Sequence, residues 1–168
     1  MGLSDQISRY RNRASIVMAR RRLKGRTEPP GPAPFVCGVT RSGTTLLRLM
    51  LDSHPEMAIP GETHWLPKLI KAFERGKQTP DDAAALIIDH KRWGDFHLDG
   101  ELLRQRIHQL DPVTAADTIR TFYRVYAERE GKTRYGDKTP GYIKEMIRIQ
   151  RVLPEARFIH IIRDGRDV

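Results

Sequence analysis

Residues 35–51 read Phe35-Val36-Cys37-Gly38-Val39-Thr40-Arg41-Ser42-Gly43-Thr44-Thr45-Leu46-Leu47-Arg48-Leu49-Met50-Leu51. The first apolar run predicts a short strand, the two glycines predict a turn, and the second apolar run predicts a helix that begins near Thr44. A strand that passes through a glycine-containing turn into a helix is the local architecture of a phosphate-binding loop. The stretch therefore predicts an α/β protein with an anion site at this turn.

The spacing of the two glycines is that of the nucleotide-binding loop of NTPases, in which four residues separate the glycines and a lysine and a hydroxyl residue follow. Here Thr44 replaces the lysine, and a cation stands two residues before Gly43, as Arg41. That lysine reaches the β- and γ-phosphates beside Mg²⁺, so we expect this loop to bind a smaller oxyanion without a metal. The expected donors are the loop itself and its side chains, namely Arg41, Ser42, Gly43, Thr44 and Thr45. A capped helix with a surface arginine is the alternative.

Further along the chain, apolar spacing predicts helices at 65–73, 102–110, 115–126 and 143–152, and Thr79-Pro80-Asp81-Asp82 predicts another helix start. We expect the faces at 102–110 and 115–126 to serve packing only. Residues 133–136 predict a weak strand. Arg157–Ile162 predicts the clearest buried strand, with His160 packed inside it.

Strands separated by helices predict a parallel sheet flanked by helices, in which ligands bind beyond the carboxyl ends of the strands. Three polar clusters follow strands or the turn, at 41–45, 137–140 and 163–167. We expect them to meet at one edge of the sheet. Only six residues follow the last predicted strand, so we expect the domain to be incomplete at its C-terminus.

The charge is concentrated at the start of the chain. Residues 1–26 hold eight Lys or Arg and one acid, which is +7 of the formal +9, so residues 27–168 carry only +2. This argues against nucleic-acid binding by the body. We expect a basic arm and a proline-rich linker at 1–34 and one domain at 35–168. Peripheral contact with an anionic membrane, an organelle transit peptide and an arm packed on the body are all left open.

The composition suits a globular protein in a reducing compartment. The chain is 39% hydrophobic and 30% charged, and its single cysteine, Cys37, lies inside an apolar run. No apolar run is long enough for a secretory signal or a membrane span. We therefore expect a cytoplasmic protein, with membrane association through residues 1–26 left open.

The motifs resemble those of the sulfotransferases that use 3′-phosphoadenosine-5′-phosphosulfate. Arg41-Ser42-Gly43-Thr44-Thr45 is similar to their 5′-phosphosulfate loop, and Arg163-Asp164-Gly165-Arg166-Asp167 is similar to the start of their 3′-phosphate segment. The likeness is greatest to the tyrosylprotein sulfotransferases and related bacterial enzymes. It continues through Met50-Leu51-Asp52-Ser53-His54-Pro55 and Gly61-Glu62-Thr63.

The resemblance implies a role for several residues. Glu62 takes the place of the general base, Lys138 and Arg41 steady the transferring sulfuryl group, and Arg163 holds the 3′-phosphate of the co-substrate. No metal is implied. The acceptor would carry a hydroxyl on a small molecule, glycan, lipid or peptide. Gly61 and Thr139 depart from the tyrosylprotein pattern, which leaves a tyrosine-peptide acceptor open, and the family's 3′-phosphate serine would fall beyond Val168.

Each role has a simpler alternative. Glu62 could cap the following helix, Lys138 could be a surface lysine, and Arg163 could pair with Asp164 or Asp167. For the whole chain, two other functions are left open: a nucleotide kinase with an atypical loop, and a non-catalytic binding module that docks through its basic arm.

Overall fold

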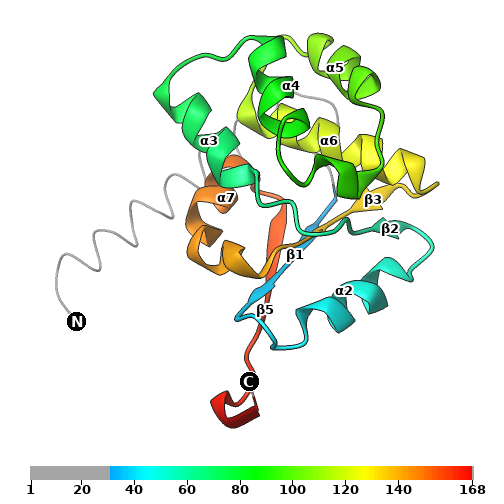
Figure 1. Cartoon of the computed structure of the whole chain (residues 1–168), viewed down its shortest axis with the longest axis vertical. Coiled ribbons are helices and arrows are strands. Elements are labelled where there is room, and N and C mark those ends of the chain that lie inside the picture. Colours follow the sequence, from blue (N-terminus) through cyan, green and yellow to red (C-terminus); the bar gives the residue numbers. More distant parts are fainter. Residues whose placement is uncertain (1–30, 168) are drawn as a thin grey trace, which may run out of the picture.

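The computed structural model describes residues 31–167, which form a small sheet of parallel strands between helices (Figure 1). The predicted basic arm at 1–26 lies outside the described residues. The elements are, in chain order, β1 (Ala33–Gly38), α2 (Thr44–Asp52), β2 (Met57–Ala58), α3 (Leu66–Arg75), α4 (Pro80–Ile88), η2 (Trp93–Phe96), α5 (Gly100–His108), α6 (Ala115–Arg129), β3 (Arg134–Tyr135), β4 (Asp137–Lys138), η3 (Pro140–Lys144), α7 (Met146–Val152), β5 (Ala156–Ile161) and η4 (Gly165–Asp167).

The main sheet has the order β4-β1-β5, and both neighbours run parallel to β1. Phe35 of β1 pairs with Asp137, and the whole of β1 pairs with β5. A separate parallel pair joins β2 to β3. These strands confirm the predicted parallel sheet flanked by helices.

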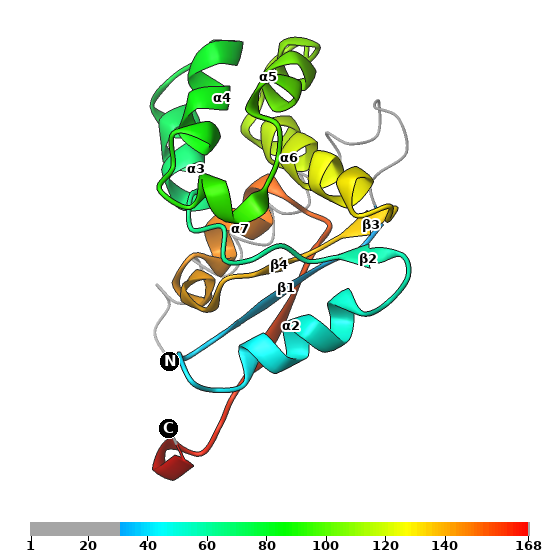
Figure 2. The same cartoon turned by 45° about the vertical axis from the view of Figure 1, so that its right-hand side comes forward.

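Helices cover both faces of the main sheet. Figure 2 shows α2 on one side of the strands and α3 to α6 on the other. An aromatic core attaches that helical layer to the sheet: Tyr123 of α6 meets the ring of Phe35 edge-on at 6.1 Å and stacks on Tyr135 at 5.2 Å. Trp65 meets Phe122 edge-on at 4.9 Å. Rings in these arrangements stabilise the fold beyond the area they bury.

The predicted helices are found, except that the one predicted at 143–152 begins only at Met146, because Ile143 belongs to the 3-10 helix η3 that precedes it. Helix α4 shows the clearest local cause. Thr79 caps α4 by accepting a hydrogen bond from the Asp82 N–H, and the Asp82 carboxylate accepts one from the Thr79 N–H in return. Pro80 occupies the first turn, where no N–H donor is needed. Within residues 31–167, none of the helices combines the length and the apolar character that crossing a membrane requires.

Strand β1 begins at Ala33, two residues before the predicted start of the body. Pro34 lies inside the strand and pairs with Arg157 of β5. On the other side of β1, pairing with β4 begins only at Phe35. The missing N–H of Pro34 therefore leaves no ladder bond unmade on that side, which is the condition under which a sheet tolerates proline.

The prediction of a buried strand at 157–162 is wrong in its burial. Strand β5 is paired only with β1 among the described residues, and Arg157 and His160 are exposed. Ile162 is 83% exposed. An apolar run favours burial on both faces, but a strand at the edge of a sheet is covered less than a central one. His160 accordingly does not pack inside the protein as expected.

Gly136 separates β3 from β4 at the point where the chain passes from one sheet to the other. A Cβ at Gly136 would lie 2.5 Å from the carbonyl oxygen of Pro34 and 2.9 Å from Pro34 Cγ. We expect Gly136→Ala to lower the free energy of unfolding by about 1–3 kcal/mol, because the rigid β1 backbone must move. Gly141→Ala, whose Cβ would meet nothing within 4 Å, is the control. Urea unfolding measures both, and equal losses would contradict the packing argument.

Candidate functional site

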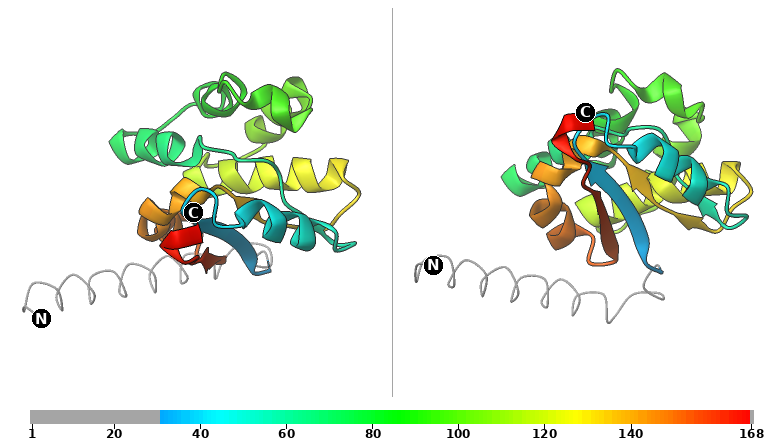
Figure 3. Two further views of the ribbon diagram at one scale, coloured as in Figure 1. Left: turned by 60° about the horizontal axis from the view of Figure 1, so that its bottom comes forward. Right: turned by 90° about the horizontal axis from the view of Figure 1, so that it is seen from below.

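The sheet order places the three predicted polar clusters at neighbouring strands, with Asp137 and Lys138 of the second cluster inside β4 itself. Strands β4, β1 and β5 are parallel neighbours, so the segments that follow them leave the sheet on the same side. The guanidinium of Arg163 donates a hydrogen bond from Nη1 to the Arg41 carbonyl oxygen at 3.3 Å. Figure 3 shows the C-terminal segment beside the turn between β1 and α2. The first and third clusters therefore touch, although they are far apart in sequence.

The turn between β1 and α2 is folded tightly on itself. The Ser42 hydroxyl and the Ser42 N–H both donate to the Val39 carbonyl oxygen, at 2.6 and 3.3 Å. A Cβ at Gly38 would lie 2.8 Å from the Ile161 carbonyl oxygen, so only glycine lets β5 approach this closely. Gly43 has a φ of 97°, a conformation that glycine adopts without strain. Both glycines of the motif therefore have a backbone reason to be glycine.

The N-terminus of α2 is open to an anion. Gly43 is its cap residue, and no side chain accepts a hydrogen bond from the first turn. Arg41 and Thr45 are exposed beside it, whereas the side chains of Ser42 and Thr44 are buried. Free N–H groups at the positive end of a helix attract negative charge, and an exposed arginine adds to that attraction. This edge can therefore hold an oxyanion.

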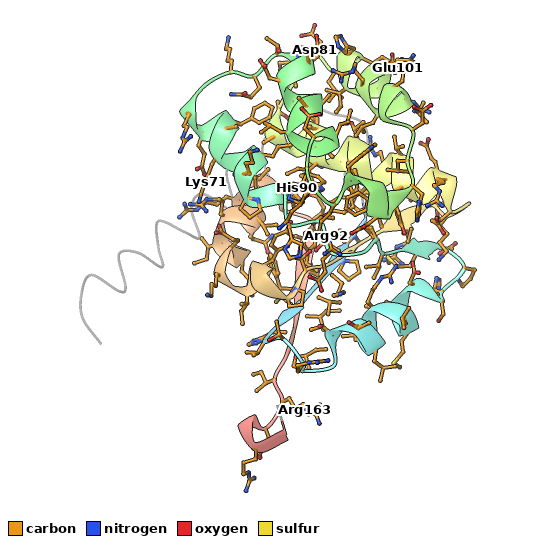
Figure 4. All side chains as sticks on the ribbon, viewed as in Figure 1. Lys71, Asp81, His90, Arg92, Glu101 and Arg163 are labelled. Atoms are coloured by element: carbon orange, nitrogen blue, oxygen red, sulfur yellow. The ribbon has the colours of Figure 1, made fainter. Side chains whose placement is uncertain are left out.

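A groove adjoins the turn at the ends of β1 and β5. Its volume is about 510 Å³, and it contains the side chain of Arg163. Figure 4 shows Arg163 at the end of the molecule opposite Asp81 and Glu101, which belong to the helical layer. The residues that line the groove are Val39, Ser42, Ile143, His160, Ile161, Ile162, Arg163 and Gly165. The groove has the size of a small-molecule site.

The second cluster contributes a partly buried ion pair. Lys138 Nζ donates to Glu62 Oε1 at 2.8 Å, and the other carboxylate oxygen, Oε2, lies 2.8 Å from His64 Nε2. The side chain of Lys138 is 7% exposed, whereas that of Glu62 is 29% exposed. The carboxylate is thus held from two sides while part of it faces solvent. A carboxylate in this state can accept a proton from a molecule that approaches it.

The neighbours of Glu62 decide its ionisation. Partial burial raises the pKa of Glu62, but the hydrogen bond and charge of Lys138, followed by those of His64, outweigh it and hold the pKa below the ordinary value of 4.5. Glu62 is therefore a carboxylate at neutral pH.

These contacts argue against several of the simpler alternatives. Helix α3 has Trp65 as its cap residue and no side-chain cap, so Glu62 does not cap it. Lys138 is buried and ion-paired, so it is not a surface lysine. Asp164 accepts hydrogen bonds from Arg166 rather than pairing with Arg163. The side chain of Asp167, the other partner considered for Arg163, lies outside the described residues.

His64 was not among the predicted site residues. It has a φ of 55°, uncommon for a residue with a side chain, and its ring lies against Glu62. It also belongs to a cationic neighbourhood: burial lowers the pKa of His90, and the charges of His64, Lys91, Lys68 and Arg92 lower it further. Figure 4 shows His90 and Arg92 between the helical layer and the strands. A histidine two residues after a predicted base, in a turn, was the available signal.

Tyr123 corrects the expectation that residues 115–126 serve packing only. Its hydroxyl donates to Asp137 Oδ2 at 2.8 Å, and Thr63 donates to the same oxygen at 2.8 Å. Asp137 is fully buried, and burial raises its pKa from the ordinary 3.8 to about 6 although these hydrogen bonds lower it. A buried polar network thus adjoins the Glu62–Lys138 pair, because Thr63 follows Glu62 and Asp137 precedes Lys138 in the chain.

Metal ligation finds no support in the described part of the chain. No group of three or more His, Cys, Asp or Glu side chains between residues 31 and 167 is arranged to hold a metal ion.

Comparison with known proteins identifies the family. The sulfotransferase family model matches residues 32–168. Protein-tyrosine sulfotransferase A of Caenorhabditis elegans is 28% identical over 80% of this chain and 31% of its own length, and human protein-tyrosine sulfotransferase 1 is 27% identical over 80% and 32%. The nodulation protein NoeE of Sinorhizobium fredii is 28% identical over 79% and 30%. The chain spans about a third of the length of these relatives.

Among solved structures, the sulfotransferase domain of the Synechococcus PCC 7002 olefin synthase is 27% identical. The alignment covers 82% of this chain and 50% of that domain's chain, with a TM-score of 0.45.

The raised pKa of Asp137 predicts a pH-dependent stability. The folded state binds more protons than the unfolded state between the ordinary pKa of 3.8 and the folded pKa of about 6, so stability falls as the pH rises through this window. We expect the free energy of unfolding of the natural protein to fall by about 2 kcal/mol from pH 4 to pH 7 relative to Asp137→Asn. Urea unfolding of both proteins at four pH values measures the difference, and parallel pH profiles would contradict the shift.

Proposed function

The chain belongs to the sulfotransferase family, and on that premise we propose that it transfers the sulfuryl group of 3′-phosphoadenosine-5′-phosphosulfate to an acceptor hydroxyl, with Glu62 as the general base. The observation that carries this proposal is the Lys138–Glu62 ion pair of 2.8 Å. Lys138 lies on β4, next to β1, and β1 leads into the uncapped N-terminus of α2. It joins a carboxylate able to take a proton to a cation able to face a transferring anion. The nucleotide kinase alternative lacks the loop lysine, and family membership argues against it.

The residues present suit such a donor. The close turn at Gly38, the uncapped N-terminus of α2 and exposed Arg41 suit the 5′-phosphosulfate, and Arg163 at the groove suits the 3′-phosphate. The donor supplies the reactive S–O bond, which breaks to leave adenosine 3′,5′-bisphosphate while a new bond forms between sulfur and the acceptor oxygen. The acceptor proton goes to Glu62. Arg41 and Lys138 stabilise the charge on the sulfuryl oxygens and on the departing phosphate, the type of contribution that is usually largest in group transfer.

The ion pair couples the basicity of Glu62 to the occupancy of Lys138. While Lys138 holds Glu62, the pKa of the carboxylate stays low. A negatively charged group beside Lys138 competes for the ammonium and weakens that hold, so Glu62 becomes a stronger base when both substrates are present.

The acceptor class is proposed only as a hydroxyl compound. The names of the relatives include protein-tyrosine sulfotransferases, which favours a peptide hydroxyl among the candidates. Gly61 and Thr139 differ from the tyrosylprotein pattern, so a panel should contain a tyrosine peptide, a glycan, a hydroxylated lipid and a simple phenol.

Donor recognition is tested by calorimetric titration with adenosine 3′,5′-bisphosphate, 5′-AMP and ATP, each with and without Mg²⁺. We expect the bisphosphate to bind most tightly and independently of Mg²⁺. Arg163→Ala should weaken bisphosphate binding about tenfold or more, as for a lost charge-assisted hydrogen bond, and leave 5′-AMP binding unchanged. Arg166→Ala, an exposed arginine of the same segment that pairs with Asp164, is the matched control. Preference for Mg²⁺-ATP would indicate a kinase, and the absence of binding by any of the three nucleotides would contradict the proposed donor site.

The base is tested with ³⁵S-labelled donor and the acceptor panel. We expect Glu62→Gln to lower transfer about 10²–10⁴-fold while bisphosphate binding stays within twofold, because an amide keeps the contact with Lys138 but takes no proton. Arg41→Ala should weaken both transfer and bisphosphate binding. Glu101→Gln, at an exposed glutamate of α5, is the matched control. Full activity of Glu62→Gln would show that another group is the base.

A further inference from the structure

Asp137 and its partners form a buried polar network that neither the motifs nor the family match assigns to any role. We propose that Asp137 is a positioning residue, whose carboxylate ties the segment that carries Glu62 to the strand that carries Lys138. The hydrogen bonds that join these two segments are seen in the structure itself. Their consequence for catalysis rests on the proposed function.

The network joins four parts of the fold. Asp137 Oδ2 on β4 accepts hydrogen bonds from the Thr63 hydroxyl and from Tyr123 of α6, each at 2.8 Å. Because Thr63 gives its one hydroxyl proton to Asp137, the hydroxyl of Tyr142 in η3 donates to Thr63 Oγ1, at 2.7 Å. Tyr142 in turn accepts from the Leu66 N–H at the start of α3, at 3.3 Å. A continuous donor chain therefore runs from α3 to the carboxylate.

A second contact fixes the same two segments. The Thr63 N–H donates to Thr139 Oγ1 at 3.0 Å, so residues on both sides of Lys138 hold Thr63. Thr63 follows Glu62 and Asp137 precedes Lys138, and adjacent Cα atoms are always about 3.8 Å apart. Fixing Thr63 against Asp137 and Thr139 therefore fixes the two backbone positions from which Glu62 and Lys138 project.

Burying the Asp137 carboxylate lowers the stability of the fold. A residue that only filled space would not carry this cost. Asp137 is fully buried, and its Oδ1 has no hydrogen-bond partner among the described residues. The groups that face it are Thr63, Thr139, Tyr123 and Tyr142, all uncharged at neutral pH, and the charge of His64 acts to lower its pKa. An unpaired buried oxygen and a desolvated charge both oppose folding. The alignment of Glu62 with Lys138 is what this arrangement provides.

The contacts predict what loosening the network does. If Thr63 no longer binds Asp137, the segment that carries Glu62 can move, and the Lys138–Glu62 hydrogen bond is formed for a smaller fraction of the time. The pKa of Glu62 then rises toward its ordinary value. This readout needs neither donor nor acceptor. A residue that only stabilises the fold would leave it unchanged.

The test uses Thr63→Val, which keeps the shape of Thr63 but removes its hydroxyl, and Thr63→Ser, which restores the hydroxyl. The Glu62 carboxyl is followed by ¹³C NMR in protein labelled at glutamate, and its signal is assigned by its absence in Glu62→Gln. We expect Thr63→Val to raise the pKa of Glu62 and Thr63→Ser to leave it near the natural value. Thr118→Val is the matched control: Thr118 is also fully buried, and its hydroxyl donates only to the Thr114 carbonyl oxygen, at 2.8 Å.

An unchanged pKa of Glu62 in folded Thr63→Val, or an equal rise in Thr118→Val, would overturn the proposal. Should Thr63→Val not fold, Tyr123→Phe removes one hydroxyl from Asp137 at a greater distance from Glu62. We expect a smaller rise there, and no rise would overturn the proposal equally.

Activity then separates this proposal from the proposed function. With ³⁵S-labelled donor, we expect Thr63→Val to lower kcat about tenfold or more and to change KM for the donor less than twofold, since misplacement of reacting groups lowers the rate rather than donor binding. The pKa of Glu62 could shift in Thr63→Val while no protein, the natural one included, transfers the label. That result would contradict the proposed function and would still support the positioning of the Glu62–Lys138 pair by Thr63 and Asp137. A shifted pKa with an unchanged kcat would overturn the catalytic consequence.

Discussion

Strand β1 pairs with a parallel strand on each side, and this pairing is the constraint on which the site depends. The hydrogen-bond ladders to β4 and β5 fix the register between segments about 100 and 120 residues apart in the chain. Because the strands are parallel, everything that follows them emerges at one edge. The close approach of β5 also explains Gly38, where a side chain would collide with the Ile161 carbonyl. The turn between β1 and α2, Lys138 and Arg163 take their relative positions from this register.

The same register positions Lys138, one partner of the Glu62–Lys138 pair. A lysine that is 7% exposed would be expensive to bury alone, and the carboxylate at 2.8 Å offsets that cost. The pair is asymmetric, because Glu62 reaches solvent more than Lys138 does and has His64 as a second partner. A group that enters from solvent therefore meets the carboxylate first, while the ammonium is held from the protein side. This is the arrangement expected where a proton acceptor faces outward and a charge stabiliser must not move.

The sequence predicts the local parts of this arrangement and fails on the parts that depend on register. The turn at 38–43, the cap at Thr79 and the helices are local, because glycine spacing, capping residues and 3.6-residue periodicity determine them. Glu62 and Lys138 could be named from the family resemblance, but not their contact across 76 residues. The hydroxyl of Tyr123 looked like part of a packing face, because nothing local shows which strand residue it meets. The burial of β5 was wrong for the same reason: hydrophobicity does not tell which strand lies at the edge.

Two buried carboxylates in this chain show why Asp137 requires a separate explanation. Glu155 accepts two hydrogen bonds from the guanidinium of Arg120, at 2.7 and 3.0 Å, and both side chains are almost fully buried. Burial lowers the pKa of Arg120, but Glu155 raises it above the ordinary value, so each charge stabilises the other. Asp137 instead receives neutral hydroxyl donors, and its pKa rises. A buried carboxylate whose task is to join two elements can be given a cation, as Glu155 is. A cation at Asp137 would compete with Lys138 for Glu62, so neutral donors are the ones that can hold this segment without disturbing the pair beside it.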